Sequence, residues 1–181
     1  LPTLMLFAMV FSVLGVPVIT LLPVVARDVL GLGPDGYGAL MATLGIGAMV
    51  GALAIAATGG GGNKGRTLYL ASHVFPVALI AFAAVRVPSL NGLLLFVVGI
   101  AMIVNNALVN ARLQDIVPDA MRGRVISLYV MVYIGGSPIG SFVAGAIAKW
   151  FGATWAIGGT AVLMLLFALW VFRREPALSA H

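Results

Sequence analysis

Residues 90–111 read LNGLLLFVVGIAMIVNNALVNA, and this stretch decides the class of fold. It contains no Asp, Glu, Lys or Arg. An α-helix needs roughly 20 apolar residues to cross the hydrocarbon core of a bilayer. The stretch is long enough for this and therefore predicts a transmembrane helix.

The composition of the whole chain agrees with a membrane protein. Of its 181 residues, 62% are hydrophobic and 8% are charged, whereas soluble domains have roughly 45–50% apolar and about 25% charged residues. The net charge of +5 comes from basic residues at the ends of apolar blocks, which does not predict a nucleic-acid surface. The absence of cysteine excludes disulfides and thiolate metal sites, and neither a metal nor a cofactor is predicted.

Five further apolar segments flank residues 90–111, and none has a charged residue before its final position. They predict an all-α integral membrane protein in which residues 1–181 form a single six-helix bundle. Kinks are expected near Pro17 and Pro138, because proline removes a helix hydrogen bond. The six predicted spans are 3–26, 37–57, 67–85, 90–111, 125–149 and 154–172.

Basic residues predict the orientation of the bundle. Cytoplasmic loops are enriched in Lys and Arg, and the best placement leaves only Arg27, Arg86 and Lys149 outside. Both chain ends are then cytoplasmic. The inner group consists of Lys64, Arg66, Arg112, Arg122, Arg124, Arg173 and Arg174.

The start of the chain and a glycine run between two spans give further expectations. The chain opens at Leu1 almost inside a span, without a basic leader, so we expect a piece of a longer protein. The glycine run 59–62 lacks the spacing of a phosphate-binding loop and is interpreted as a flexible turn.

Small residues recur every fourth position in the span 125–149. Such rows let membrane helices approach closely, and Gly47 and Gly51 are assigned the same packing role. Pro138, on the same face, would make the helix bendable. The two rows are Gly136, Gly140 and Ala144, and Ser137, Ser141 and Gly145.

Asn105, Asn106 and Asn110 place uncharged amides at membrane depth. Unpaired amides are costly in hydrocarbon, so these side chains should face protein or a water-filled cavity. Two interpretations stay open, namely hydrogen bonds between helices and the lining of a substrate cavity.

Hydroxyl groups supply the other cavity candidates. Tyr133 lies deeper than Tyr129, for which an interfacial aromatic belt is the alternative. Ser12 and Thr20 are eight residues apart and share a helix face, although small hydroxyls also bond to their own helix. Ser137 completes the candidates.

His73 is the one intramembrane titratable group besides the tyrosines. A proton relay is one interpretation, but His73 lies about two turns from Arg66, which favours a structural role. An intramembrane hydrolase using Ser137 is not predicted, because no G-x-S-x-G arrangement surrounds that serine.

The loop before residue 125 carries the candidate gate. Asp119 follows Pro118 and is expected to cap a helix start. Arg122 and Arg124 can pair with acids or anionic headgroups.

Residues 110–129, with the string Pro-Asp-x-x-Arg-Gly-Arg, resemble the junction between the tenth and eleventh helices of major facilitator exporters. The similarity is greatest to the branch with the bacterial enterobactin exporter and macrolide and multidrug efflux proteins. Residues 135–145, 150–152 and 45–52 are also similar to that branch. The chain would then be spans seven to twelve, the C-terminal half. At residues 58–66, however, it lacks the acid of the family pattern Gly-x-x-x-Asp-Arg-x-Gly-Arg, which makes Arg122 and Arg124 better gate candidates.

The resemblance implies secondary active export of a small molecule by alternating access, in a bacterial inner membrane. Its first, second, fourth and fifth spans would line the cavity or gates, while the third and sixth would lie outside. The N-terminal half would be its partner, and protons, if used, would be carried there. A non-transporting scaffold that packs through its small-residue faces is the alternative. No enzyme activity is expected.

Overall fold

The computed structural model describes residues 2–57 and 63–175. The glycine run 59–62 lies outside this part. Six helical spans long and apolar enough to cross a membrane are present in it, which confirms the predicted all-α membrane fold. The elements are α1 (Pro2–Gly15), α2 (Pro17–Val24), the π-helix η1 (Val25–Val29), α3 (Pro34–Ala57), α4 (Lys64–Ala84), α5 (Pro88–Ile116), α6 (Asp119–Phe151) and α7 (Ala153–Arg174).

Proline interrupts the first span, which consists of α1, α2 and η1 in succession. Pro17 has no N–H to donate to the carbonyl of Val13, and the Val16 N–H lies 3.4 Å from the Ser12 carbonyl. The predicted kink at Pro17 thus coincides with the break between α1 and α2. Helix α6 instead continues through Pro138.

Helices α5 and α6 extend beyond the predicted spans, to Ile116 and from Asp119. A span predicted from hydropathy ends where charges begin, whereas a helix can continue into water. The expectation that Asp119 caps α6 is wrong: the N-cap residue is Pro118, without a side-chain cap bond, and Asp119 is the first helical residue. Its carboxylate still lies at the positive end of the helix dipole.

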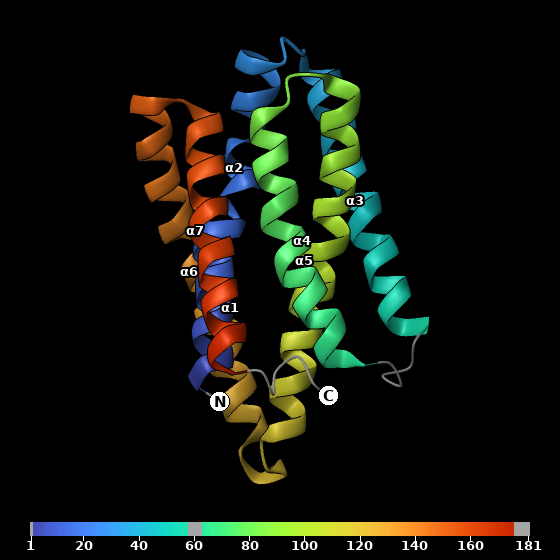
Figure 1. Ribbon diagram of the computed structural model, residues 1–181, viewed down its shortest axis with the longest axis vertical. Coiled ribbons are helices and arrows are strands. Elements are labelled where there is room, and N and C mark those ends of the chain that lie inside the picture. The colour runs from blue at the N-terminus through green and yellow to red at the C-terminus, as the bar shows by residue number, and fades with distance from the viewer. Residues whose placement is uncertain (1, 58–62, 176–181) are drawn as a thin grey trace.

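The helices pack in pairs that repeat across the bundle (Figure 1). Helix α3 packs against α5, α1 against α6, and α4 against α7. If spans one to three correspond to spans four to six, then α1 corresponds to α5, α3 to α6 and α4 to α7. The α3–α5 pair then corresponds to the α6–α1 pair, and the α4–α7 pair corresponds to itself. Because corresponding spans run in opposite directions, this is the arrangement of an inverted repeat, as in transporter halves.

Glycines make the closest contacts of both pairs. A Cβ on Gly51 would lie 2.8 Å from the carbonyl oxygen of Ile100, and a Cβ on Gly140 would lie 2.7 Å from the carbonyl carbon of Val13. Gly47 and Gly136 each precede one of these glycines by one turn and also lie against the partner helix. The second and fifth spans therefore use the same four-residue glycine spacing against the fourth and first spans.

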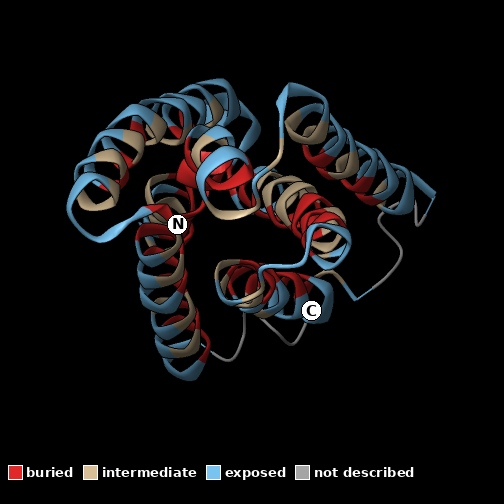
Figure 2. Ribbon diagram, turned by 90° about the horizontal axis from the view of Figure 1, so that it is seen from above, coloured by how far each residue is buried: buried red, intermediate tan, exposed pale blue. Residues whose placement is uncertain are grey.

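Helices α3 and α6 are the least buried spans (Figure 2). Only 22% and 17% of their apolar windows are buried, against 44–50% in the other spans. Large side chains such as Leu53 and Phe142 are exposed on them. These two helices therefore offer apolar surface to lipid or to another bundle.

Candidate functional site

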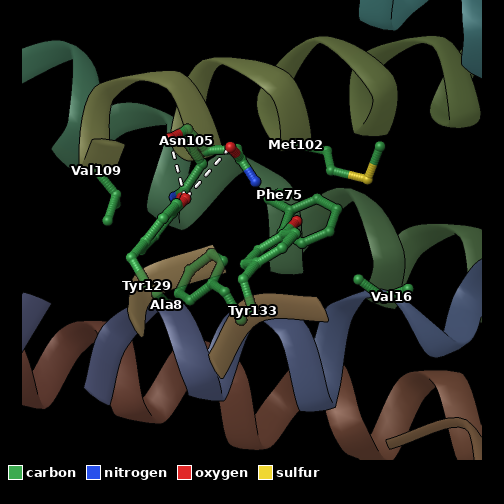
Figure 3. A pocket seen from close by; sticks show the side chains of 10 residues that line it. Ala8, Val16, Phe75, Met102, Asn105, Val109, Tyr129 and Tyr133 are labelled. Carbon is green, nitrogen blue, oxygen red and sulfur yellow. Dashed lines mark hydrogen bonds between the residues drawn. The ribbon is translucent and has the colours of Figure 1, made fainter. Parts of the chain in front are cut away.

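A pocket lies in the seam between α1 and α6 on one side and α4 and α5 on the other (Figure 3). We call it the seam pocket. None of its lining residues is charged. They are Ala8, Phe11, Val16, Phe75, Met102, Asn105, Asn106, Val109, Tyr129 and Tyr133.

A tyrosine on α6 bridges the seam to α5. The Tyr129 hydroxyl donates to Asn106, with its oxygen 3.3 Å from Oδ1 and 3.4 Å from the backbone carbonyl oxygen (dashed lines in Figure 3). Tyr129 is only 3% exposed, so it does not belong to an interfacial aromatic belt. Sequence reasoning ranked it below Tyr133 because depth was judged from sequence position alone.

Tyr133 continues the aromatic wall one turn further along α6. Its ring stacks on that of Tyr129, with 6.0 Å between centroids and 24° between planes. The ring lines the seam pocket, while the backbone carbonyl of Tyr133 accepts a hydrogen bond from the Ser12 hydroxyl. Tyr133 is half-buried, which leaves its ring partly accessible to a ligand.

The three asparagines of α5 have different surroundings. Asn105 is buried and donates from Nδ2 to Ser72 Oγ on α4 over 2.9 Å, so it makes a bond between helices while lining the pocket. Asn106 faces Tyr129. Asn110 lies outside the pocket lining, and its Oδ1 accepts a hydrogen bond from Gln114 of the same helix. Asn105 and Asn106 thus make hydrogen bonds between helices and also line the seam pocket, while the lining of a substrate cavity stays a prediction.

The hydroxyl candidates lie at helix contacts. Ser12 is fully buried against α6, and Thr20 Oγ1 is 2.9 Å from Ser141 Oγ. Neither Ser12 nor Thr20 lines the seam pocket, nor does Ser137. The cavity role expected for these three residues does not extend to this pocket.

The same contacts establish the register of two parallel spans. The Ser12–Tyr133 and Thr20–Ser141 hydrogen bonds both join residues 121 positions apart. The prolines at 17 and 138 have the same separation, since 138 − 17 = 121. Each proline therefore lies at the same level of its span, directly across the α1/α2–α6 contact.

Sequence reasoning missed the apolar part of the pocket. Phe75 reaches it from α4, beside Phe11, with 6.0 Å between ring centroids. Gly15 makes room, because a Cβ there would lie 2.6 Å from Phe75 Cε1. The third span thus contributes to the wall of this pocket, and none of the lining residues comes from α3. The resemblance implied a place outside the cavity for the third span, and which spans line the transport cavity stays a prediction. The contact of Phe75 with Phe11 and its close approach to Gly15 place its ring in the wall.

The pocket is small. The volume open to the centre of a water molecule is about 10 Å³, about what one water needs. Any larger ligand must therefore occupy an opened seam, or the space in front of it.

The candidate gate charges make local contacts. Arg122 Nη2 is 2.6 Å from Asp119 Oδ1, one turn away on α6, and Arg124 is exposed. The ion pair that joins two helices at this end was not predicted: Lys64 Nζ on α4 is 3.1 Å from Asp115 Oδ2 on α5. It lies beside the loop in which the family's acid is missing.

His73 lies outside the pocket lining. Its Nδ1 is 2.7 Å from the Tyr69 carbonyl oxygen, and its ring packs near those of Tyr69 and Phe172. This position on the α4–α7 contact favours the structural interpretation. Within residues 2–57 and 63–175, no group of three or more His, Cys, Asp or Glu side chains is arranged to hold a metal ion.

The predicted packing residues divide between close and open positions. Gly47, Gly51, Gly136 and Gly140 lie against backbone or side chains of a neighbouring span. At Gly145, an added Cβ would have no described atom within 4 Å. The second row of small residues on α6 thus packs less closely than the first.

Comparison with known proteins gives one family match. The model of a major facilitator family described as transmembrane secretion effector (MFS_3) matches residues 1–179. No curated protein matches the chain at a significant level.

Proposed function

The chain belongs to the transmembrane secretion effector family of major facilitators, and from this premise we propose that it is one half of a secondary active exporter. The seam pocket is the observation that carries the proposal. Its wall combines residues from the first and third spans with residues from the fourth and fifth. Transporters place their substrate sites at such repeat interfaces near the bilayer midplane.

The chemistry of the wall indicates the class of substrate. Aromatic rings, a Met102 thioether and the Asn106 amide offer apolar contact with a few hydrogen bonds and no charge. Such a site suits a largely apolar small molecule with some polar groups. A drug, a macrolide or a siderophore-like compound fits this description and agrees with the exporter branch that the sequence resembles.

A second six-helix half would complete the transport path. The broad exposed faces of α3 and α6 are available for it, and the substrate would lie between that half and the seam pocket. No carboxylate lines the pocket, so a proton-coupled mechanism would carry its proton on the other half. The basic residues at the start of α4 and on both sides of the α5–α6 junction would face the cytoplasm of a bacterial cell.

Bending of two spans supports alternating access. Pro17 and Pro138 lie at one level of parallel neighbouring spans, and each removes one backbone hydrogen bond. A bend at this level would move the adjoining Tyr133 side of the pocket relative to Asn106. The seam would then open or close as the halves rock.

The experiment measures efflux of a panel of fluorescent apolar compounds from cells that express the complete transporter. Tyr133→Phe and Asn106→Ala should change the relative rates among the compounds, with unchanged amounts of protein in the membrane. Tyr69→Phe is the matched control, because it removes a phenol hydroxyl outside the pocket. Unchanged rates for every compound in both variants would contradict the site.

A non-transporting scaffold is the second candidate, since glycine contacts alone account for close packing. It is favoured if the complete protein, inserted and folded, transports no compound of the panel and still associates with its partner proteins when Tyr133 is replaced. The six-helix bundle alone is not expected to transport.

A further inference from the structure

A second, larger groove lies where α4 and α6 end and α7 begins. It shares no residue with the seam pocket. Its volume is about 760 Å³, within the roughly 300–1,000 Å³ of ordinary ligand sites. Because it is formed by membrane-spanning helices, its occupant must be compatible with a bilayer.

Glycine and aliphatic side chains make the groove apolar. Gly158 and Gly159 lie on its α7 side, and Ile80, Ile147 and Leu163 contribute from the three helices. A Cβ on Gly159 would meet no described atom within 4 Å. The space beside Gly159 is therefore open to a hydrocarbon chain.

One positive charge lies at the end of this apolar surface. Arg86 lies two residues beyond the end of α4, is exposed, and is the one charged residue among those that line the groove. The N-cap of α7 is Gly152, which provides no side-chain cap, so N–H groups of the first turn point to the same end without intrahelical acceptors. The helix dipole adds positive potential there.

Aromatic side chains indicate the depth of this end. Trp155 lines the groove and is 75% exposed, and the neighbouring Trp150 is 79% exposed. Tryptophan concentrates at the headgroup level of membranes. Arg86 is therefore at headgroup depth, and the aliphatic part of the groove extends into the acyl region.

We propose that this groove binds an anionic phospholipid, with the phosphate at Arg86 and one acyl chain along Gly158 and Gly159. A zwitterionic lipid is a poorer fit, because no carboxylate lines the groove to pair with its ammonium group. A second copy of the chain is also a poorer fit, since it would bury the Arg86 guanidinium against an apolar surface, which is costly without a partner.

The test uses Trp155 as the reporter. The complete transporter is used, with every tryptophan except Trp155 replaced by Phe; within residues 1–181 these are Trp150 and Trp170. The protein is reconstituted into phosphatidylcholine bilayers with equal mole fractions of brominated phosphatidylglycerol or brominated phosphatidylcholine, and bromine quenching of Trp155 is compared. One basic residue contributes about 1 kcal/mol to binding of anionic lipid, so we expect about fivefold enrichment of phosphatidylglycerol.

Three variants separate the contributions. Arg86→Gln should abolish the preference, and Arg86→Lys should retain most of it. Gly159→Leu should fill the groove and reduce quenching by both lipids. Arg27→Gln removes the same charge at the same end of the bundle, away from the groove, and should leave the preference unchanged.

Equal quenching by the two lipids in the parent protein would overturn the proposal, as would a preference that survives Arg86→Gln. Equal quenching together with concentration-dependent self-association that Gly159→Leu abolishes would assign the groove to a second copy instead. None of these readouts depends on transport activity, so the result stands or falls separately from the exporter proposal.

Discussion

Gly140→Ala tests the close contact between α6 and α1. The added Cβ would lie 2.7 Å from the carbonyl carbon of Val13 and 2.8 Å from its Cα. The obstacle is backbone, which cannot rotate away, so the helices must separate by several tenths of an ångström. Overpacking of this kind costs about 1–3 kcal/mol, and alanine recovers up to about 1 kcal/mol of helix propensity. We expect a net loss of about 1–2 kcal/mol.

Gly145→Ala is the matched control on the same helix, because its Cβ meets no described atom within 4 Å. It should be neutral or stabilise the protein by up to about 1 kcal/mol. The free energy of unfolding is measured for both variants by denaturant titration in mixed micelles, followed by circular dichroism. Equal effects of the two substitutions would refute the assignment of Gly140 to a backbone contact.

Three further outcomes follow from other contacts. Asn105→Ala should lower the free energy of unfolding by about 0.6–1.7 kcal/mol, the range for hydrogen bonds between membrane helices, and the same titration would show no loss if the amide bonded only within α5. Lys64→Gln should cost less than about 1 kcal/mol, because its bridge to Asp115 is partly exposed; a larger loss that persists at high salt would contradict a surface ion pair. Pro17→Ala and Pro138→Ala should each raise thermal stability in detergent, since a missing backbone hydrogen bond is restored, and each should slow efflux. In the double variant, a decrease in efflux rate that is the sum of the two single effects would show that the bends act independently. A larger decrease would show that they act together.

The helices could be predicted because each apolar segment ends at a charge, a proline or a glycine. The extension of α6 back to Asp119 could not, since a helix that leaves the bilayer no longer follows hydropathy. The glycine spacing at 136 and 140 indicated packing, but not that Val13 would be the neighbour. That information lies in the pairing of spans more than 120 residues apart.

The seam pocket could also be predicted only in part from the sequence. Amides at membrane depth were visible in sequence, yet Asn105 and Asn106 differ only by about 100° of helix rotation, and their partners on α4 and α6 decide their roles. Phe75 carried no signal at all, because a phenylalanine within an apolar span looks like any other. Its position depends on Gly15, which leaves the space that its ring occupies.

The glycine contacts at 51 and 140 have a mechanical consequence. Interlocking side chains resist sliding, because each must leave its groove before the next position is reached. Here backbone lies against backbone at both glycines, so no side chain at these two points opposes sliding along the helix axis. A side chain at either glycine would add such an obstacle, and would therefore oppose any sliding of the two three-span units past one another.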